Sequence, residues 1–225
     1  MTETTLEDEY EKLEELGALL IEEVLKTLPE HVREPTLRVV NFRKTLSHES
    51  DRGSAMMGAA YIEDRLATLL STFLIDDSGA VTPLFEFNGP FGTFSSKIDV
   101  AYVLGLIPAN VRRDIHLLRK IRNDFGHRWE PLSFSDKPIV GRCRELALDG
   151  MEKNSEPRGK FNRSIMAAVA CIERQIAETQ RRVSIENHDI SASVAGAKWL
   201  VDFMKSQGLN QAVDIFEQTH IRKNE

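Results

Sequence analysis

The hexapeptide RNDFGH, Arg122–His127, combines residue types that handle phosphate groups. The guanidinium of Arg122 can bind phosphate oxygens in a bidentate way, and His127 is of the residue type that most often acts as a general base. The surrounding segment, Val111–Arg128, holds six bases against two acids in a chain whose net charge is −6. Two interpretations compete: a helix end with its capping residues, or a site that handles phosphate.

Helical geometry decides whether these side chains meet. At about 100° per residue, Val111–His127 separates into an apolar and a polar face. The apolar face comprises Val111, Leu118, Ile121 and Phe125. The polar stripe comprises Arg112, His116, Lys120, Asn123 and, if the helix lasts that long, His127. Positions five apart lie about 140° apart on a helix, so Arg122 and His127 converge only if the helix ends between them.

Gly126 is placed to end the helix, because glycine readily takes the left-handed conformation that terminates helices. In the structural interpretation, His127 then interacts with free carbonyls and Arg122 pairs with a buried acid. Glu63 is a candidate partner, because it lies on an apolar stripe of another predicted helix, where a carboxylate is unusual. Asp64 is next to it. We expect an Arg122–Glu63 or Arg122–Asp64 pair, because a guanidinium on the shoulder of an apolar face needs a partner.

The elements that position these residues are helical almost throughout. Apolar residues recur at spacings of three or four, and no β-alternation of useful length appears. Helices are predicted over residues 6–28, 36–46, 51–75, 94–106, 110–125, 135–149 and 160–183, with two more in 189–225. Pro29 ends the first, Pro35 opens the second, Thr93 caps the fourth, and Pro108 or Asn110 opens the fifth. Small residues in GSAMMGAA, near the start of the third, allow another helix to approach, and Asp76–Gly92 is expected to be the longest irregular segment.

These patterns predict an all-α protein, with a single helical-bundle domain of about seven to nine helices and a C-terminal helical hairpin. Residues 1–185 are expected to form the bundle, with an acidic amphipathic helix in residues 1–30. Residues 186–225 are expected to be a helical extension packed on it. The N-terminal helix carries an apolar stripe that needs cover, which favours a homodimer. The stripe comprises Leu13, Leu16, Leu20 and Val24.

Composition argues against several classes of protein. The two cysteines, Cys143 and Cys171, have no metal or redox spacing, and no phosphate-binding glycine loop is present, so we expect neither a metal nor a cofactor. The N-terminus does not resemble a signal peptide. The longest charge-free stretch, Val100–Val111, falls short of the roughly 20 residues of a membrane span, so we expect a cytoplasmic protein without membrane contact. A net charge of −6 disfavours autonomous DNA binding, which needs clustered Lys and Arg.

Two stretches, FNGPFGTFSSKIDVAYVLGLI and HLLRKIRNDFGH, resemble the mannitol operon repressor family of bacteria, helical proteins that regulate transcription. The resemblance covers about residues 45–185 and includes the Gly-Pro-hydrophobic-Gly loop at Gly89–Gly92. It implies a transcriptional repressor. We find no convincing helix-turn-helix with a basic recognition helix, so we expect the protein to act mainly by contacting another regulatory protein. The acidic N-terminal helix and the apolar loop around Phe85–Phe91 are the expected surfaces.

The RNxxxH pattern also resembles the signature of the HEPN superfamily of helical nucleotide-binding and ribonuclease domains. This resemblance implies metal-independent RNA cleavage, usually with two motifs brought together across a dimer. Arg122 would steady the charge on the attacked phosphate, Asn123 would orient groups around it, and His127 would exchange a proton with the ribose 2′-OH. The accompanying binding residues would be Arg112, His116, Arg119 and Lys120. The regulator is our first hypothesis, and a HEPN-type ribonuclease or RNA-binding domain is the alternative.

Overall fold

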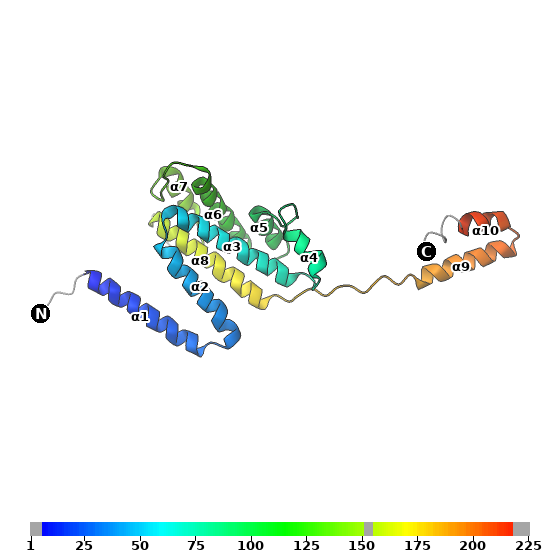
Figure 1. Cartoon of the computed structure of the whole chain (residues 1–225), viewed down its shortest axis with the longest axis horizontal. Helices are drawn as coiled ribbons and strands as arrows, with labels where there is room; N and C mark the ends of the chain where they lie inside the picture. Colours follow the sequence, from blue (N-terminus) through cyan, green and yellow to red (C-terminus); the bar gives the residue numbers. More distant parts are fainter. Residues whose placement is uncertain (1–5, 151–154, 218–225) are drawn as a thin grey trace. The chain divides into compact units, whose positions relative to one another are not determined.

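The computed structural model describes residues 6–150 and 155–217, which contain helices and no strand (Figure 1). This confirms the predicted all-α fold. The helices are α1 (Leu6–Thr27), α2 (Glu30–His48), α3 (Asp51–Phe73), α4 (Ser78–Phe85), α5 (Phe94–Val103), α6 (Ala109–His127), α7 (Lys137–Glu145), α8 (Pro157–Glu178), α9 (Ser191–Ser206) and α10 (Asn210–Phe216). None of these described helices is long and apolar enough to cross a membrane.

The chain divides into two compact units, Met1–Val183 and Ser184–Glu225. The first unit contains α1 to α8, and the second is the helical pair α9 and α10, whose buried valines Val201 and Val213 provide its small interior. The packing of the C-terminal hairpin on the bundle stays a prediction.

Helix α3 forms the centre of the first unit and packs against α8, α6 and α5. Its apolar stripe, which includes Ile62, Leu66 and Leu70, is fully buried. The small residues near its start allow a close approach, as predicted: a Cβ atom on Gly58 would lie 3.0 Å from Cδ1 of Ile165 on α8. The core that supports α6 is therefore built on a helix contact that leaves no room for a side chain at residue 58.

The start of α2 differs from the prediction. The helix begins at Glu30, after Pro29, and Pro35 lies inside it instead of opening it. A proline in the interior costs one backbone hydrogen bond, but contacts beyond the reach of a local pattern support this turn. The guanidinium of Arg33 donates from Nε to the carbonyl oxygen of Leu25 at 2.9 Å and from Nη2 to that of Leu28 at 3.1 Å. These bonds satisfy free carbonyls at the end of α1 and hold it to α2.

The segment Asp76–Gly92 was expected to be irregular throughout, and that prediction was wrong, because it contains α4. Asp77 caps this helix by accepting a hydrogen bond from the backbone N–H of Ala80 at 3.1 Å. The loop that follows α4 is tightly folded: a Cβ atom on Gly89 would lie 2.4 Å from the carbonyl oxygen of Pro83. The longest irregular stretch of the described residues is instead 179–190.

The two turns that lead into α6 have clear causes in the sequence. Thr93 caps α5 as predicted, with Oγ1 accepting from the backbone N–H of Ser96 at 3.1 Å within a capping box. Gly105, with φ +74°, takes the left-handed conformation in the turn after α5. Pro108 then precedes the first residue of α6, so the helix start that sequence placed at Pro108 or Asn110 is confirmed at Pro108.

Candidate functional site

Helix α6 does not end at Gly126. It runs through His127, with Arg128 as its C-terminal cap, and Gly126 is absent from the described glycines with positive φ. The predicted glycine cap was therefore wrong. A glycine inside a helix costs only about 1 kcal/mol relative to alanine. Packing of the last turn offsets this cost: Phe125 is fully buried, and its ring lies 5.0 Å from that of Phe134.

Arg122 does not pair with Glu63 or Asp64, so this prediction was also wrong. Glu63 Oε1 accepts from Nζ of Lys97 on α5 at 2.8 Å, because the nearly buried ammonium of Lys97 requires a carboxylate. Asp64 contacts the arginine that follows it on α3. The guanidinium of Arg122 donates to Oδ1 of Asn123 at 3.1 Å, and no carboxylate among the described residues forms an ion pair with it.

The continuous helix separates Arg122 from His127. Five positions along an unbroken helix place the two side chains about 140° apart. His127 is exposed, whereas Arg122 and Asn123 are half-buried. A single chain therefore does not present Arg122 and His127 to the same phosphate group.

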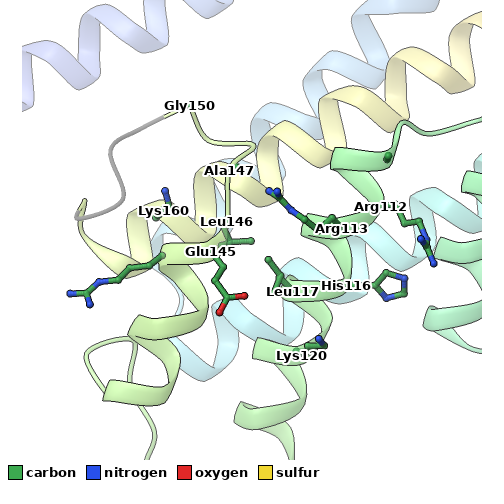
Figure 2. A pocket seen from close by; sticks show the side chains of 12 residues that line it. Arg112, Arg113, His116, Leu117, Lys120, Glu145, Leu146, Ala147, Gly150 and Lys160 are labelled. Carbon is green, nitrogen blue, oxygen red and sulfur yellow. The ribbon is translucent and has the colours of Figure 1, made fainter.

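A different part of α6 lines a cavity of about 1200 Å³ (Figure 2). Its walls come from the first half of α6, from the end of α7 with the residues after it, and from the first turn of α8. The lining residues are Ala109, Arg112, Arg113, His116, Leu117, Lys120, Arg144, Glu145, Leu146, Ala147, Gly150 and Lys160. Of the residues that sequence proposed for binding, Arg112, His116 and Lys120 lie here. Arg119 does not line the cavity, and its Nε is buried without a hydrogen-bond partner among the described residues.

Asp99 on α5 fixes one edge of the cavity. Its Oδ1 accepts from Nε and Nη2 of Arg112, at 2.8 and 2.6 Å, and lies 3.1 Å from Nε2 of His116. The hydrogen bonds from Arg112 first, and from His116 second, lower the pKa of the Asp99 carboxyl below its ordinary value. Both basic side chains are thus held by a group outside α6.

Asp114 connects α6 to the opposite wall. Its side chain is fully buried, and Oδ2 accepts from the backbone N–H groups of Ala147 and Leu148 at 2.7 and 2.8 Å. Oδ1 accepts from Nη2 of Arg113 at 2.5 Å. Sequence reasoning missed this residue, although a signal was present: Asp114 falls three residues after Val111, on the apolar face, where a carboxylate needs hydrogen-bond donors.

The remaining cations of the cavity differ in how they are held. Lys160 is 1% exposed, and its Nζ lies 3.1 Å from Oδ1 of Asp149. Lys120 and Arg144 are exposed and form no ion pair with any described residue. Glu145 is the one carboxylate on the described lining. The cavity therefore combines fixed cations with two that are free to bind an anion. The described residues contain no group of three or more His, Cys, Asp or Glu side chains arranged to hold a metal.

Comparisons with known proteins agree with the first resemblance. Residues 49–160 match the model of the mannitol repressor family. Over 81 residues, the chain is 33% identical to the mannitol operon repressors of Escherichia coli K12 and O6:H1, a match that spans 35% of this chain and 42% of each relative. A chain of the X-ray structure of the MtlR–HPr complex from Escherichia coli has a similar fold, with a TM-score of 0.50 at 21% identity over 59% of this chain and 98% of that one. The region that runs from the start of α3 into α8 is therefore similar to the mannitol repressor family.

Proposed function

We propose that this protein is a transcriptional regulator that acts mainly through contact with another regulatory protein, in the bacterial cytoplasm. The observation that carries the proposal is the match of residues 49–160 to the mannitol repressor family. Those residues include α3, which packs at the centre of the first unit, and α6 and α7, which contribute to the lining of the cavity. The net charge of −6 supports weak or no autonomous DNA binding, because affinity for DNA depends on neutralising phosphates with Lys and Arg.

The partner that we propose is a protein of the HPr class. The support is that a protein of similar fold has been crystallised in an MtlR–HPr complex. HPr is consequently the first purified protein to test against this chain.

Phe87 is the aromatic anchor that we propose for the contact. This residue is 88% exposed in the loop after α4, whereas the neighbouring Phe85 and Phe91 pack on each other with ring centroids 5.4 Å apart. A Cβ atom on Gly92 would lie 2.3 Å from the carbonyl oxygen of Glu86, so the loop is tightly folded around Phe87. A large apolar group on a well-packed loop loses little entropy on binding, which suits an interface anchor.

Titration calorimetry of the purified full chain with purified HPr tests the proposal. We expect saturable binding to HPr and no specific binding to promoter DNA by the chain alone. Phe87→Ser should weaken HPr binding about tenfold or more, because truncating an anchor costs at least about 1–2 kcal/mol. Trp129→Ser is the matched control, since Trp129 is equally exposed outside that loop, and it should bind as the parent does.

The outcomes separate the two parts of the proposal. Absence of HPr binding together with tight, sequence-specific DNA binding by the isolated chain would overturn the regulatory mechanism. If Phe87→Ser binds HPr as tightly as the parent does, the regulatory mechanism stands, but the proposed contact through Phe87 is wrong. The stability of both variants should equal that of the parent, because exposed side chains contribute little to the free energy of unfolding.

A further inference from the structure

We infer that the cavity beside α6 is a binding site for a small phosphate ester, with the phosphate group held by Lys120 and Arg144. The inference concerns a ligand and not a protein partner, so it does not depend on the proposed regulatory contact. It rests on the charges that line the cavity, on the way those charges are fixed, and on an apolar surface next to them.

Positive charge exceeds negative charge on the lining that the structure describes. Five Lys and Arg side chains and His116 line this part of the cavity, against one carboxylate, that of Glu145. Arg112, Arg113 and Lys160 each form an ion pair with an acid outside the lining. Lys120 and Arg144 form no ion pair with any described residue. A phosphate monoester carries about 1.5 to 2 negative charges at neutral pH. Its charge therefore matches the two unpaired cations.

The other cations of the lining are held in place by the protein itself, before any ligand arrives. Buried Asp114 ties Arg113 on α6 to the backbone of Ala147 and Leu148. Asp149 holds the nearly fully buried Lys160 on α8. Cations held in this way remain in place when the ligand binds, so they add favourable potential without losing side-chain entropy.

Apolar side chains also line the cavity beside the charged ones. Leu117 projects from α6 into the cavity between Lys120 and Arg113, and faces Leu146 on the opposite wall (Figure 2). Pockets for organic ligands combine such apolar contacts with a few polar groups that fix orientation. The organic part of an ester would lie against the accessible edge of Leu117 and the exposed Ala147 while the phosphate binds the cations. A long nucleic acid fits less well, since its affinity requires an extended basic surface and this chain has a net charge of −6.

Thermal shift and calorimetry on the full chain test the site with three probes: inorganic phosphate, glycerol 3-phosphate and glycerol, at equal ionic strength. We expect both phosphates to raise the melting temperature and glycerol to have no effect. The double variant Lys120→Gln/Arg144→Gln should raise the Kd for phosphate at least about tenfold, because each charged hydrogen bond contributes substantially to affinity. Glu145→Gln should lower the Kd, because it removes the like charge on the lining.

The matched control is Arg43→Gln/Lys44→Gln. Both residues are exposed on α2, outside the cavity, and neither forms an ion pair with a described residue, so this variant loses the same charge elsewhere. It should bind phosphate as the parent does. Three results would overturn the inference: no response to either phosphate, equal weakening in both double variants, or binding of RNA oligonucleotides with no binding of the two small phosphates.

Discussion

At the scale of single residues, the described structure pairs acidic side chains of α3, α5 and α6 with basic groups, and it does not bring Arg122 and His127 of the RNxxxH motif to one point. Glu63 forms an ion pair with Lys97, and Asp99 contacts both Arg112 and His116. Asp114 is the most consequential of these acids, because it lies on an apolar face of α6 and still finds donors on another segment. Its removal offers a direct measure of how strongly the two walls of the cavity are connected.

Asp114→Ala should lower the free energy of unfolding by about 1–3 kcal/mol, because the backbone N–H groups of Ala147 and Leu148 lose their acceptor. Asp114→Asn should lose less, since a single amide oxygen at the Oδ2 position can still accept from both groups. Urea denaturation of the two variants measures the difference. Equal losses for Ala and Asn would show that the ion pair of Asp114 with Arg113, and not its hydrogen bonds to the backbone, determines its contribution to stability.

Gly126 provides a test of where α6 ends. Because it lies inside the helix without a positive φ, Gly126→Ala should raise the free energy of unfolding by up to about 1 kcal/mol. The new methyl group would meet Sδ of Met56 at 3.6 Å, an ordinary van der Waals contact. Thermal or urea denaturation gives the answer. A clear destabilisation would indicate that Gly126 adopts the left-handed conformation and ends α6. The side chains of His127 and Arg122 could then lie on the same side of the helix end.

At the scale of elements, hydrophobic periodicity located α1, α3, α6 and α8, although α8 runs over Pro157–Glu178 and not over the predicted residues 160–183. The apolar stripes of α3, α6 and α8 coincide with their buried residues, since burial of one face is what produces the pattern. The rule that proline opens a helix gave the wrong start for α2, and the rule that glycine and proline mark a loop missed α4. The start of α2 depends on Arg33 reaching back to α1, and α4 depends on its cap at Asp77, contacts that composition does not reveal.

The candidate site could be predicted only in part for the same reason. Arg112, His116 and Lys120 share one face of a helix, so a helical wheel groups them. Arg144 and Lys160 come from α7 and α8, and no spacing within the sequence indicates that they line the same cavity as α6. The prediction for Arg122 failed for a related reason. The helical wheel indicated that Arg122 needs a partner, but it could not show that Glu63 forms its ion pair with Lys97 instead.

The contact between α3 and α8 can be tested at Gly58. Gly58→Leu should lower the free energy of unfolding by about 1–3 kcal/mol or more, because a side chain there would collide with Ile165. Gly141→Ala is the control, since a Cβ atom at that position on α7 meets nothing within 4 Å. That control should be neutral or slightly stabilising by denaturation. A Gly58→Leu protein as stable as the parent would mean that the two helices do not approach closely.

At the scale of the whole molecule, the apolar stripe of α1 lacks cover within the described first unit. Leu16, Leu20 and Val24 are exposed, and Leu20 is 64% exposed. The side chain of Leu13, the fourth residue of the predicted stripe, lies outside the described residues. Of the described helices, α2 is the one with which α1 makes substantial contacts. Exposed apolar stripes of this kind are typical of helices that associate with a partner.

We therefore predict a homodimer in which α1 of one copy covers α1 of the other. A helix of 22 residues is about 33 Å long, which gives room for a self-complementary helical seam. Light scattering should show twice the chain mass for the parent, and Leu20→Glu should yield a folded monomer, because it places a charge in the seam while leaving the core intact. Val103→Glu, at an exposed apolar residue of α5, is the control and should remain dimeric. A monomeric parent at micromolar concentration would refute the dimer. A dimeric Leu20→Glu protein would place the interface away from α1.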